Sequence, residues 1–197
     1  MLSAIVFLPL AGAAIIALLA KSARTVRLVA IVVTAVDLAL VVSAFVIFNL
    51  YDWSKEGNLE LVERYRDWIP SLNIQYFLGV DGLNLPMILL TSILGMCAVF
   101  SSWNIRTRVK EYFIWLLVLQ TAVAGVFLSQ DFVLFFIFWE LELIPMFFLI
   151  SIWGSGRKEY SAMKFLIFTL LGSAFMLVGI LVLYFSLGTF DMTQMRD

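Results

Sequence analysis

Long, uninterrupted runs of apolar residues dominate the sequence and alternate with short polar connections. Six runs are long enough for a membrane-crossing helix, which needs about 20 mostly apolar residues. They are residues 2–20, 26–50, 84–103, 112–128, 132–153 and 160–187. The strands of a membrane barrel alternate polar and apolar positions over about ten residues, and these runs do not. The pattern therefore predicts an all-α polytopic membrane protein with about six transmembrane helices.

Polar segments divide the chain into four parts. They are two helices in 1–50, an extracytoplasmic loop in 51–82, four helices in 83–190 and a tail in 191–197. Within the loop, residues 59–68 place apolar side chains at three- and four-residue steps. This spacing predicts a short surface helix with aromatic residues at the headgroup level. Pro70 is expected to end that helix, and 79–82 to form a turn into the third span.

Composition agrees with a protein built for a bilayer. Hydrophobic residues make up 63% and charged residues 14%, against about 45–50% and about 25% in soluble domains. The formal net charge of −1 leaves no basic surplus for nucleic acid. One cysteine and no histidine exclude the usual zinc, haem and iron–sulfur sites and histidine-dependent nucleophilic catalysis. We therefore expect no metal or cofactor in this chain and look for its chemistry among Asp, Glu, Lys and Arg.

Basic residues in the connections predict the orientation. Connections 21–27, 106–110 and 157–158 carry eight Lys or Arg, whereas loop 51–82 and the tail carry four. By the positive-inside rule, the first set faces the cytoplasm, matrix or stroma. The N-terminus is therefore expected on the outer side, and an even number of spans returns the C-terminus there.

Two of the ionisable side chains inside the spans lie on one helix. Each such group costs at least about 2.5–3.5 kcal/mol at the membrane centre. Glu140 follows Asp131, the expected helix cap, by nine residues, about 13–14 Å, which places it near mid-membrane. On this position we favour proton handling over a protonated glutamate that only donates an interhelical hydrogen bond. Glu142 points about 200° away on the same helix, so the two carboxyl groups cannot share one site.

Lys164 and Asp37 each leave two interpretations open. Lys164 lies about 7–8 Å into the last span, so it either extends back to the interface or acts as a cation in a proton relay. Asp37 lies about 16 Å into the second span. It is either a relay residue or, as we favour, a hydrogen-bonding partner of a neighbouring helix. Gln120 is expected to hydrogen-bond between helices, and Cys97 to be a small core residue.

Three sequence blocks resemble one protein family, in its order and with its spacing. The blocks are 79–86 (GVDGLNLP), 138–146 (FWELELIPM), and 160–165 (YSAMKF) with Thr169, Gly172 and Ser173. They are similar to the antiporter-like membrane subunits of the proton-pumping NADH:quinone oxidoreductase, complex I. The resemblance is strongest to the M-type subunit, subunit 4. The double-acid form of the second block also resembles the D-type counterpart of that subunit in the plastoquinone-reducing photosynthetic complex.

The resemblance implies a proton-translocating membrane-arm subunit with the antiporter-like fold. Its membrane would be the bacterial plasma membrane, the thylakoid or the inner mitochondrial membrane. The motif match implies that Glu140 is a proton-pathway residue and leaves Lys164 as an auxiliary charge, while Glu142 and Asp37 are candidates from their positions. The family's partner lysine lies on a seventh helix, which is not among the six spans expected here. We therefore expect this sequence to hold the start of the first of the family's two repeats, without activity of its own.

The resemblance also implies that redox chemistry lies in other subunits. NADH or ferredoxin, FMN, iron–sulfur clusters and quinone are expected there, because this chain has no glycine-rich nucleotide motif. The chain would belong to an enzyme as a non-redox subunit of a translocase, with other membrane-arm subunits and the lipid bilayer as its partners. One alternative is a subunit of a multisubunit Na⁺/H⁺ antiporter or of a membrane-bound hydrogenase arm. Another is a structural membrane scaffold, in which neutral replacements of Glu140 and Asp37 disturb assembly alone.

Overall fold

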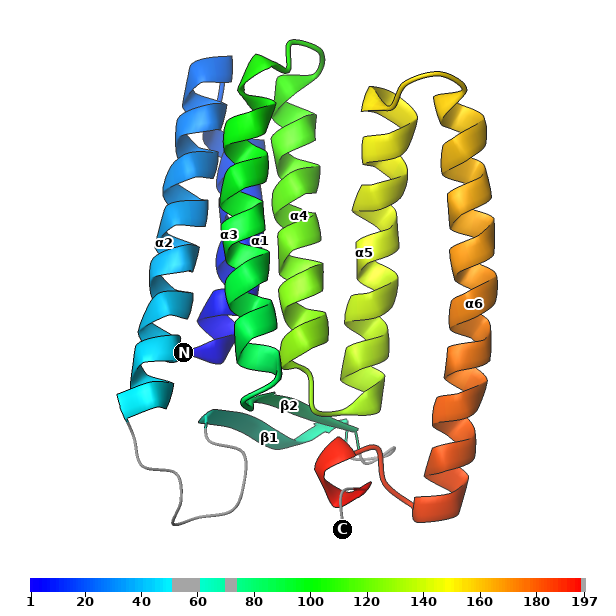
Figure 1. The fold of residues 1–197 in the computed structure, drawn as a ribbon. Coiled ribbons are helices and arrows are strands. Elements are labelled where there is room, and N and C mark those ends of the chain that lie inside the picture. The colour runs from blue at the N-terminus through cyan, green and yellow to red at the C-terminus, as the bar shows by residue number, and fades with distance from the viewer. Residues whose placement is uncertain (51–60, 70–73, 196–197) are drawn as a thin grey trace.

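The computed structural model describes residues 1–50, 61–69 and 74–195, without the side chains of residues 66, 67 and 195. Long helices run side by side, and a hairpin crosses one end of the bundle (Figure 1). The long helices are α1 (Leu2–Leu19), α2 (Ala23–Leu50), α3 (Asn84–Ser101), α4 (Val109–Leu128), α5 (Phe132–Trp153) and α6 (Lys158–Leu187). The short elements are strands β1 (Leu61–Ile69) and β2 (Ile74–Val80) and the 3₁₀ helices η3 (Ser102–Asn104) and η4 (Met192–Met195).

The predicted membrane spans are confirmed within the described ranges. Each span coincides with one long helix, and predicted and observed bounds differ by at most three residues. All six helices are long and apolar enough to cross a membrane. Agreement is close because a helix satisfies its backbone hydrogen bonds within itself, so the apolar length alone defines a span in a bilayer.

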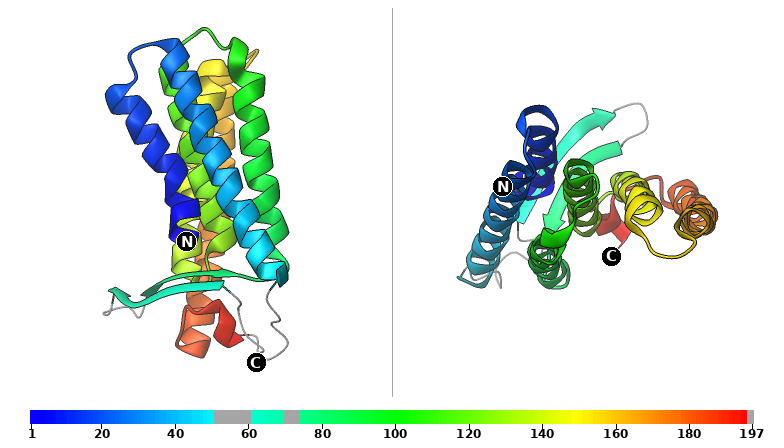
Figure 2. Two further views of the ribbon diagram at one scale, coloured as in Figure 1. Left: turned by 90° about the vertical axis from the view of Figure 1, so that its left-hand side faces the viewer. Right: turned by 90° about the horizontal axis from the view of Figure 1, so that it is seen from above.

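Helix α4 occupies the centre of the bundle. It packs against α1, α3 and α5, while α2 packs against α1 and α3. Helix α5 lies between α4 and α6, so that α6 forms the edge of the structure (Figure 2). One buried apolar cluster near the hairpin includes Val6, Leu78 and Leu128. A second cluster, toward the opposite end, includes Ile16 and Phe113.

The hairpin lies across the end of the bundle at which α3 and α5 begin. Its strands pair antiparallel, with Leu61 opposite Val80 and Tyr65 opposite Tyr76. Most of β2 is buried, and the amide of Gln130 donates a hydrogen bond of 2.9 Å to the carbonyl of Phe77. The hairpin thereby holds the connection between α4 and α5.

The prediction of a surface helix over 59–68 is wrong for the described residues, because 61–69 form β1. Apolar steps of three and four residues fit a helix locally. However, residues 74–80 provide an antiparallel partner strand for the segment. Strand formation depends on such neighbours more than on intrinsic preference, so the tertiary contact overrides the local spacing.

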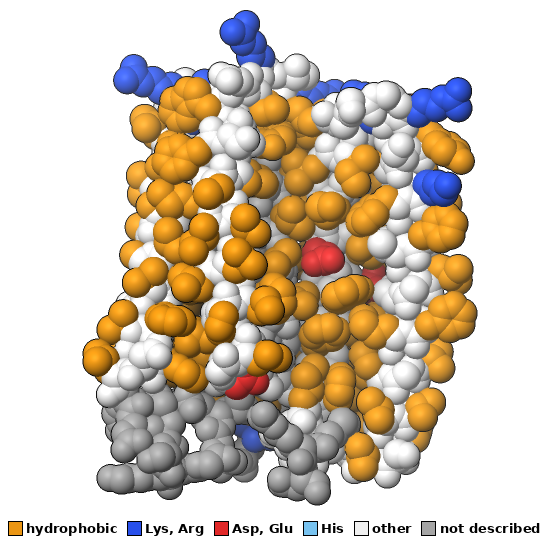
Figure 3. Space-filling model, in the orientation of Figure 1, with side chains coloured by type: hydrophobic (Ala, Val, Ile, Leu, Met, Phe, Trp, Pro, Cys, Tyr) orange, Lys and Arg blue, Asp and Glu red, His pale blue; other side chains and the backbone are white. Residues whose placement is uncertain are grey.

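The two ends of the bundle differ in charge. The connections from α1 to α2, α3 to α4 and α5 to α6 lie at one end, and the hairpin and both termini lie at the other (Figure 1). Lys and Arg side chains gather at the first end, above a wide apolar band (Figure 3). The predicted orientation rests on this separation of charge. An N-terminus on the outer side stays a prediction.

Cys97 is exposed on α3, so its prediction as a core residue is wrong. The buried face of α3 is the one that carries Ile88, Ser92 and Val99. Cys97 lies five residues after Ser92, and this spacing turns it away from that face.

Candidate functional site

A side-chain cap at the start of α5 sets the depth of the acidic residues that follow. The Oδ1 atom of Asp131 accepts hydrogen bonds from the amides of Val133 and Leu134, at 2.9 and 3.1 Å. Burial raises the pKa of Asp131 above its ordinary value, and this effect exceeds the lowering by backbone hydrogen bonds. The predicted capping role is confirmed. Glu140 follows nine residues later, about 13 Å along the helix.

Close packing against α4 fixes the rotation of α5. A Cβ atom on Gly125 of α4 would come within 2.3 Å of the Phe138 ring. The Phe138 side chain is 5% exposed. Nearer the other end of the bundle, the rings of Trp115 and Phe148 stack with centroids 4.5 Å apart. Together these contacts determine which face of α5 turns toward α4.

Glu140 lies on the side of α5 that faces α6. Val133 and Phe136 from this side form an apolar cluster with Met176 and Tyr184 of α6, and Glu140 follows Phe136 by one helical turn. The Oε1 atom of Glu140 is buried and has no hydrogen-bond partner among the described residues. A buried polar atom without a partner costs about 1–3 kcal/mol. Among the described residues, Oε1 of Glu140 therefore has no partner that would stabilise a negative charge on it.

Glu142 lies on a different face of α5. It follows Phe138 by one turn, which places it on the side that packs against α4. Its side chain is half-buried. Acidic side chains are visible at mid-height in the apolar band (Figure 3). The two-residue spacing separates the carboxyl groups of Glu140 and Glu142 as the sequence predicts.

Lys164 is not brought to Glu140. It is exposed on α6, and its Nζ lies 5.8 Å from the centre of the Phe168 ring. Phe136 and Met176 share one cluster and so mark a common level of the two antiparallel helices. Along the bundle axis, the backbone of Glu140 lies about 6 Å from that level, and the backbone of Lys164 lies about 18 Å from it in the same direction. The remaining 12 Å or so is too long for a direct ion pair.

Asp37 belongs to a separate polar cluster among α2, α3 and α4. It is 2% exposed, and its Oδ2 accepts hydrogen bonds from the Ser92 hydroxyl at 2.9 Å and the Gln120 amide at 2.8 Å. The prediction that Gln120 bonds between helices is confirmed. The favoured interpretation of Asp37, a hydrogen bond to a neighbouring helix, agrees with this geometry.

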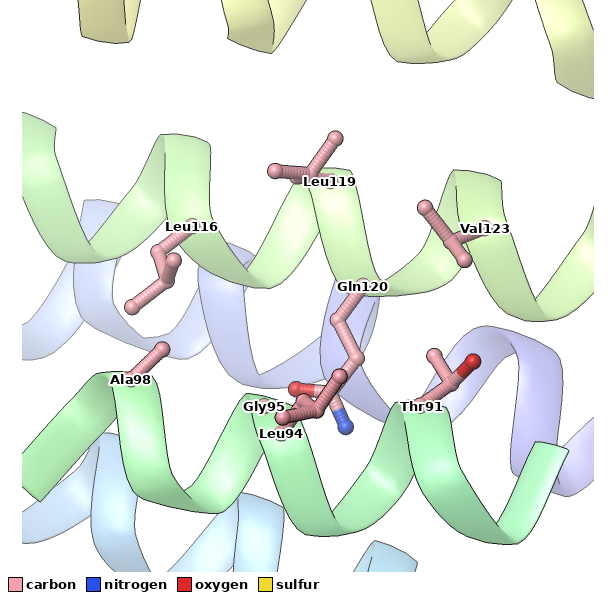
Figure 4. A pocket seen from close by; sticks show the side chains of 8 residues that line it. All are labelled: Thr91, Leu94, Gly95, Ala98, Leu116, Leu119, Gln120 and Val123. Atoms are coloured by element: carbon pink, nitrogen blue, oxygen red, sulfur yellow. The ribbon is translucent and has the colours of Figure 1, made fainter. Parts of the chain in front are cut away.

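A pocket of about 260 Å³ lies between α3 and α4, beside this cluster (Figure 4). Gln120 reaches from α4 toward α3 at Gly95, where a Cβ atom would lie 2.7 Å from its Oε1. Gly95 thus leaves the space through which the Gln120 side chain passes. Apart from Gln120 and Thr91, the lining is apolar. It consists of Leu94, Gly95, Ala98, Leu116, Leu119 and Val123.

An ionic contact that the sequence did not reveal joins the hairpin to α1. Glu63 of β1 accepts hydrogen bonds from the amides of Leu2 and Ser3, at 2.8 and 2.9 Å. It also binds the amino group of Met1 and the hydroxyl of Ser3. Burial raises the pKa of Glu63, but these contacts outweigh burial and lower the pKa to about 2. The carboxylate therefore caps the start of a helix that is distant in sequence.

A second unpredicted contact joins the hairpin to the segment after α6. Arg64 forms an ion pair of 2.5 Å with Asp191 and donates a hydrogen bond of 2.6 Å to Gln75. Its guanidinium carbon lies 4.5 Å from the centre of the Phe77 ring. No local pattern could reveal this pair, because its two residues are 127 positions apart.

Comparison with known proteins places the α5–α6 region in a family. Residues 129–197 match the family described as NADH:quinone oxidoreductase/Mrp antiporter, transmembrane. The chain is 42% identical to an NAD(P)H-quinone oxidoreductase chain 4 of Synechococcus elongatus, over 98% of this chain and 36% of the relative. It is 38% identical to the chain 4 of a Nostoc species, over 94% of this chain and 34% of the relative. Over residues 129–197, the chain belongs to the NADH:quinone oxidoreductase/Mrp antiporter family.

Solved structures share the antiporter-like fold. Respiratory complex I from Thermus thermophilus with bound NADH matches with a TM-score of 0.81 at 21% identity, over 97% of this chain and 38% of that chain. The Mrp complex from a Dietzia species matches with a TM-score of 0.78 at 22% identity, over 98% and 20%. The family and the six apolar helices identify an integral membrane protein. The chain spans about a third of the length of the curated relatives it matches.

Proposed function

We propose that the chain forms part of a proton-translocating membrane subunit of a complex I-type oxidoreductase. The assembly would couple electron transfer from NADH or ferredoxin to quinone with proton pumping. This chain would carry protons and hold no redox centre. The nucleotide or ferredoxin, FMN, iron–sulfur clusters and quinone would bind to other subunits.

The observation that carries the proposal is the mid-membrane position of the Glu140 carboxyl group and its unpartnered oxygen. Its carboxyl group lies in the middle of a membrane helix, and Oε1 has no partner among the described residues. In a medium of low dielectric constant, a nearby charge strongly shifts the balance between the neutral and ionised forms of such a group. Glu140 would therefore take up and release a proton as charges move beside it.

The other ionisable groups of the spans would have secondary roles. Lys164 would act as an auxiliary charge, which influences Glu140 through the low-dielectric interior and not through contact. Glu142 would be a further candidate for proton binding, on the side of α5 that faces α4. Family membership supports other membrane-arm subunits as partners, and an energy-transducing membrane as the location, with the N-terminus on the outer side.

Glu140→Gln in the complete assembly, reconstituted into liposomes, tests this proposal. We expect the initial rate of quinone-dependent internal acidification to fall at least about tenfold, because glutamine keeps the shape but cannot carry the proton. Glu159→Gln is the matched control, since Glu159 lies exposed in the first turn of α6, and it should pump normally. Full pumping by Glu140→Gln would refute the proposal.

A cation/proton antiporter is the second candidate, because the description of the matching family includes Mrp antiporters. The two functions differ in what drives transport. Quinone-dependent proton pumping with co-purifying iron–sulfur clusters supports the first. Exchange of Na⁺ for protons across the liposome membrane, driven by a pH gradient without an electron donor, supports the second. A mere scaffold predicts that Glu140→Gln changes assembly and nothing else.

A further inference from the structure

The hydrogen bonds of Asp37 are distributed unevenly between its two oxygens. Ser92 and Gln120 both donate to Oδ2. The other oxygen, Oδ1, is buried and has no hydrogen-bond partner among the described residues. An ionised carboxylate accepts hydrogen bonds on both oxygens. Two donors on one oxygen and none on the other is the arrangement of a carbonyl oxygen beside a hydroxyl group.

No cation faces Asp37 from the described parts of the helices packed around it. Helix α1 carries no charged side chain, and neither does α3. The charged residues of α2 and α4 lie at least nine residues, about 13 Å, from Asp37 or Gln120. The other titratable side chains are an exposed cysteine on α3 and a tyrosine bonded to Ser102. These groups are Arg24, Arg27, Lys110, Glu111, Cys97 and Tyr112.

The neighbouring pocket offers little support for a charge. Its lining is apolar except for Thr91 and Gln120, and the Thr91 hydroxyl already donates to the carbonyl of Met87 at 2.8 Å. A stable buried water needs two to four polar partners. The Gln120 amide lies between this pocket and the Asp37 carboxyl group. A negative charge on Asp37 would thus meet neither a cation nor ordered water.

We propose that Asp37, Ser92 and Gln120 form a proton-binding site separate from Glu140. Uptake forms one O–H bond on Oδ1 at the expense of a hydronium ion, which becomes water, and leaves the carboxyl group neutral. The two donors hold Oδ2 and align α2 with α3 and α4. Release returns the proton to a transient water molecule, which passes through the pocket and past Gln120 without the polar partners that would hold it there. The site does not depend on the function proposed for Glu140.

Infrared difference spectroscopy of the complete assembly in lipid tests this site. Spectra recorded between low and high pH, in H₂O and in D₂O, should contain a carboxylic C=O band that shifts in D₂O and disappears as the pH rises. We expect this band to be lost in Asp37→Asn and kept in Glu140→Gln. Glu111→Gln, which removes a carboxylate that is about half exposed at the start of α4, should also keep it.

Ser92→Ala gives a second readout that does not require loss of the carboxyl group. Removal of one donor from Oδ2 should move the band to higher frequency, because the C=O bond is then less polarised. An unmoved band in Ser92→Ala would overturn the site, even if Asp37→Asn fails to assemble. A carboxylic band that neither titrates nor exchanges in D₂O would also overturn it, since Asp37 would then be a fixed structural acid. The fate of Glu140→Gln in pumping assays affects neither result.

Discussion

The ring of Phe138 occupies the space that a side chain on Gly125 would fill. A Cβ atom at Gly125 would lie 2.3 Å from this ring, so the backbone of α4 and the ring of α5 meet without a gap. Glu140 follows Phe138 by two residues, about 200° around the helix. The contact that seats Phe138 against α4 therefore also turns Glu140 toward α6.

Gly125→Ala should destabilise the bundle and misplace Glu140. An added methyl group in a packed core typically costs about 1–3 kcal/mol, and here it must displace an aromatic ring. We expect a lower thermal midpoint for the purified protein in detergent and slower pumping in the full assembly. Gly172→Ala is the control, because a Cβ atom there meets nothing within 4 Å. Equal midpoints for the two variants would contradict this account of α5.

The features predictable from the sequence are those that depend on local spacing. Helix spans follow from apolar length, and the depth of Glu140 follows from its distance to the Asp131 cap. Gln120 is predictable as an interhelical hydrogen-bonding residue because a polar amide inside a membrane needs a partner. The identity of that partner depends on how the helices pack, so it is known only from the structure, in which Gln120 donates to Asp37.

The hairpin cannot be predicted from local spacing. Strand β1 exists because residues 74–80 pair with it, and its charged residues bind groups far away in sequence. Glu63 is 61 residues from Leu2. Spacing rules describe one element at a time, so they cannot distinguish a charged strand that ties helices together from an amphipathic surface helix.

Glu63→Gln should remove a stabilising contribution that depends on pH. The pKa of Glu63 is lowered from 4.5 to about 2, so the folded state favours the ionised form. The contribution is complete above about pH 4.5 and is lost as the pH falls toward 2. The difference in thermal midpoint between the native protein and Glu63→Gln should therefore be largest near neutral pH and shrink below pH 4.5. A difference that stays constant between pH 7 and pH 3 would exclude this ionic cap.

Asp131→Ala should weaken the start of α5 more than Asp131→Asn. Asparagine is as good a helix cap as aspartate, whereas alanine leaves the amides of Val133 and Leu134 without their acceptor, at a cost of about 0.5–2 kcal/mol. Thermal unfolding of both variants in detergent measures the difference. If asparagine proves as damaging as alanine, the capping bonds do not stabilise this end, and the charge of Asp131 or the bond that its Oδ2 accepts from the Gln75 amide does.

Arg64→Met should release the segment after α6 from the hairpin. Asp191 is 2% exposed, and loss of its cation leaves a buried charge unpaired, which costs about 3 kcal/mol. The thermal stability of Arg64→Lys should lie between those of the native protein and Arg64→Met. Lysine keeps the charge but lacks the planar fork that reaches both Asp191 and Gln75. The double variant Arg64→Met with Asp191→Asn should recover part of the loss, since no charge then remains buried. A double-mutant cycle on thermal stability in detergent measures this coupling, and strictly additive effects would show that the pair contributes nothing to holding α6 against the hairpin.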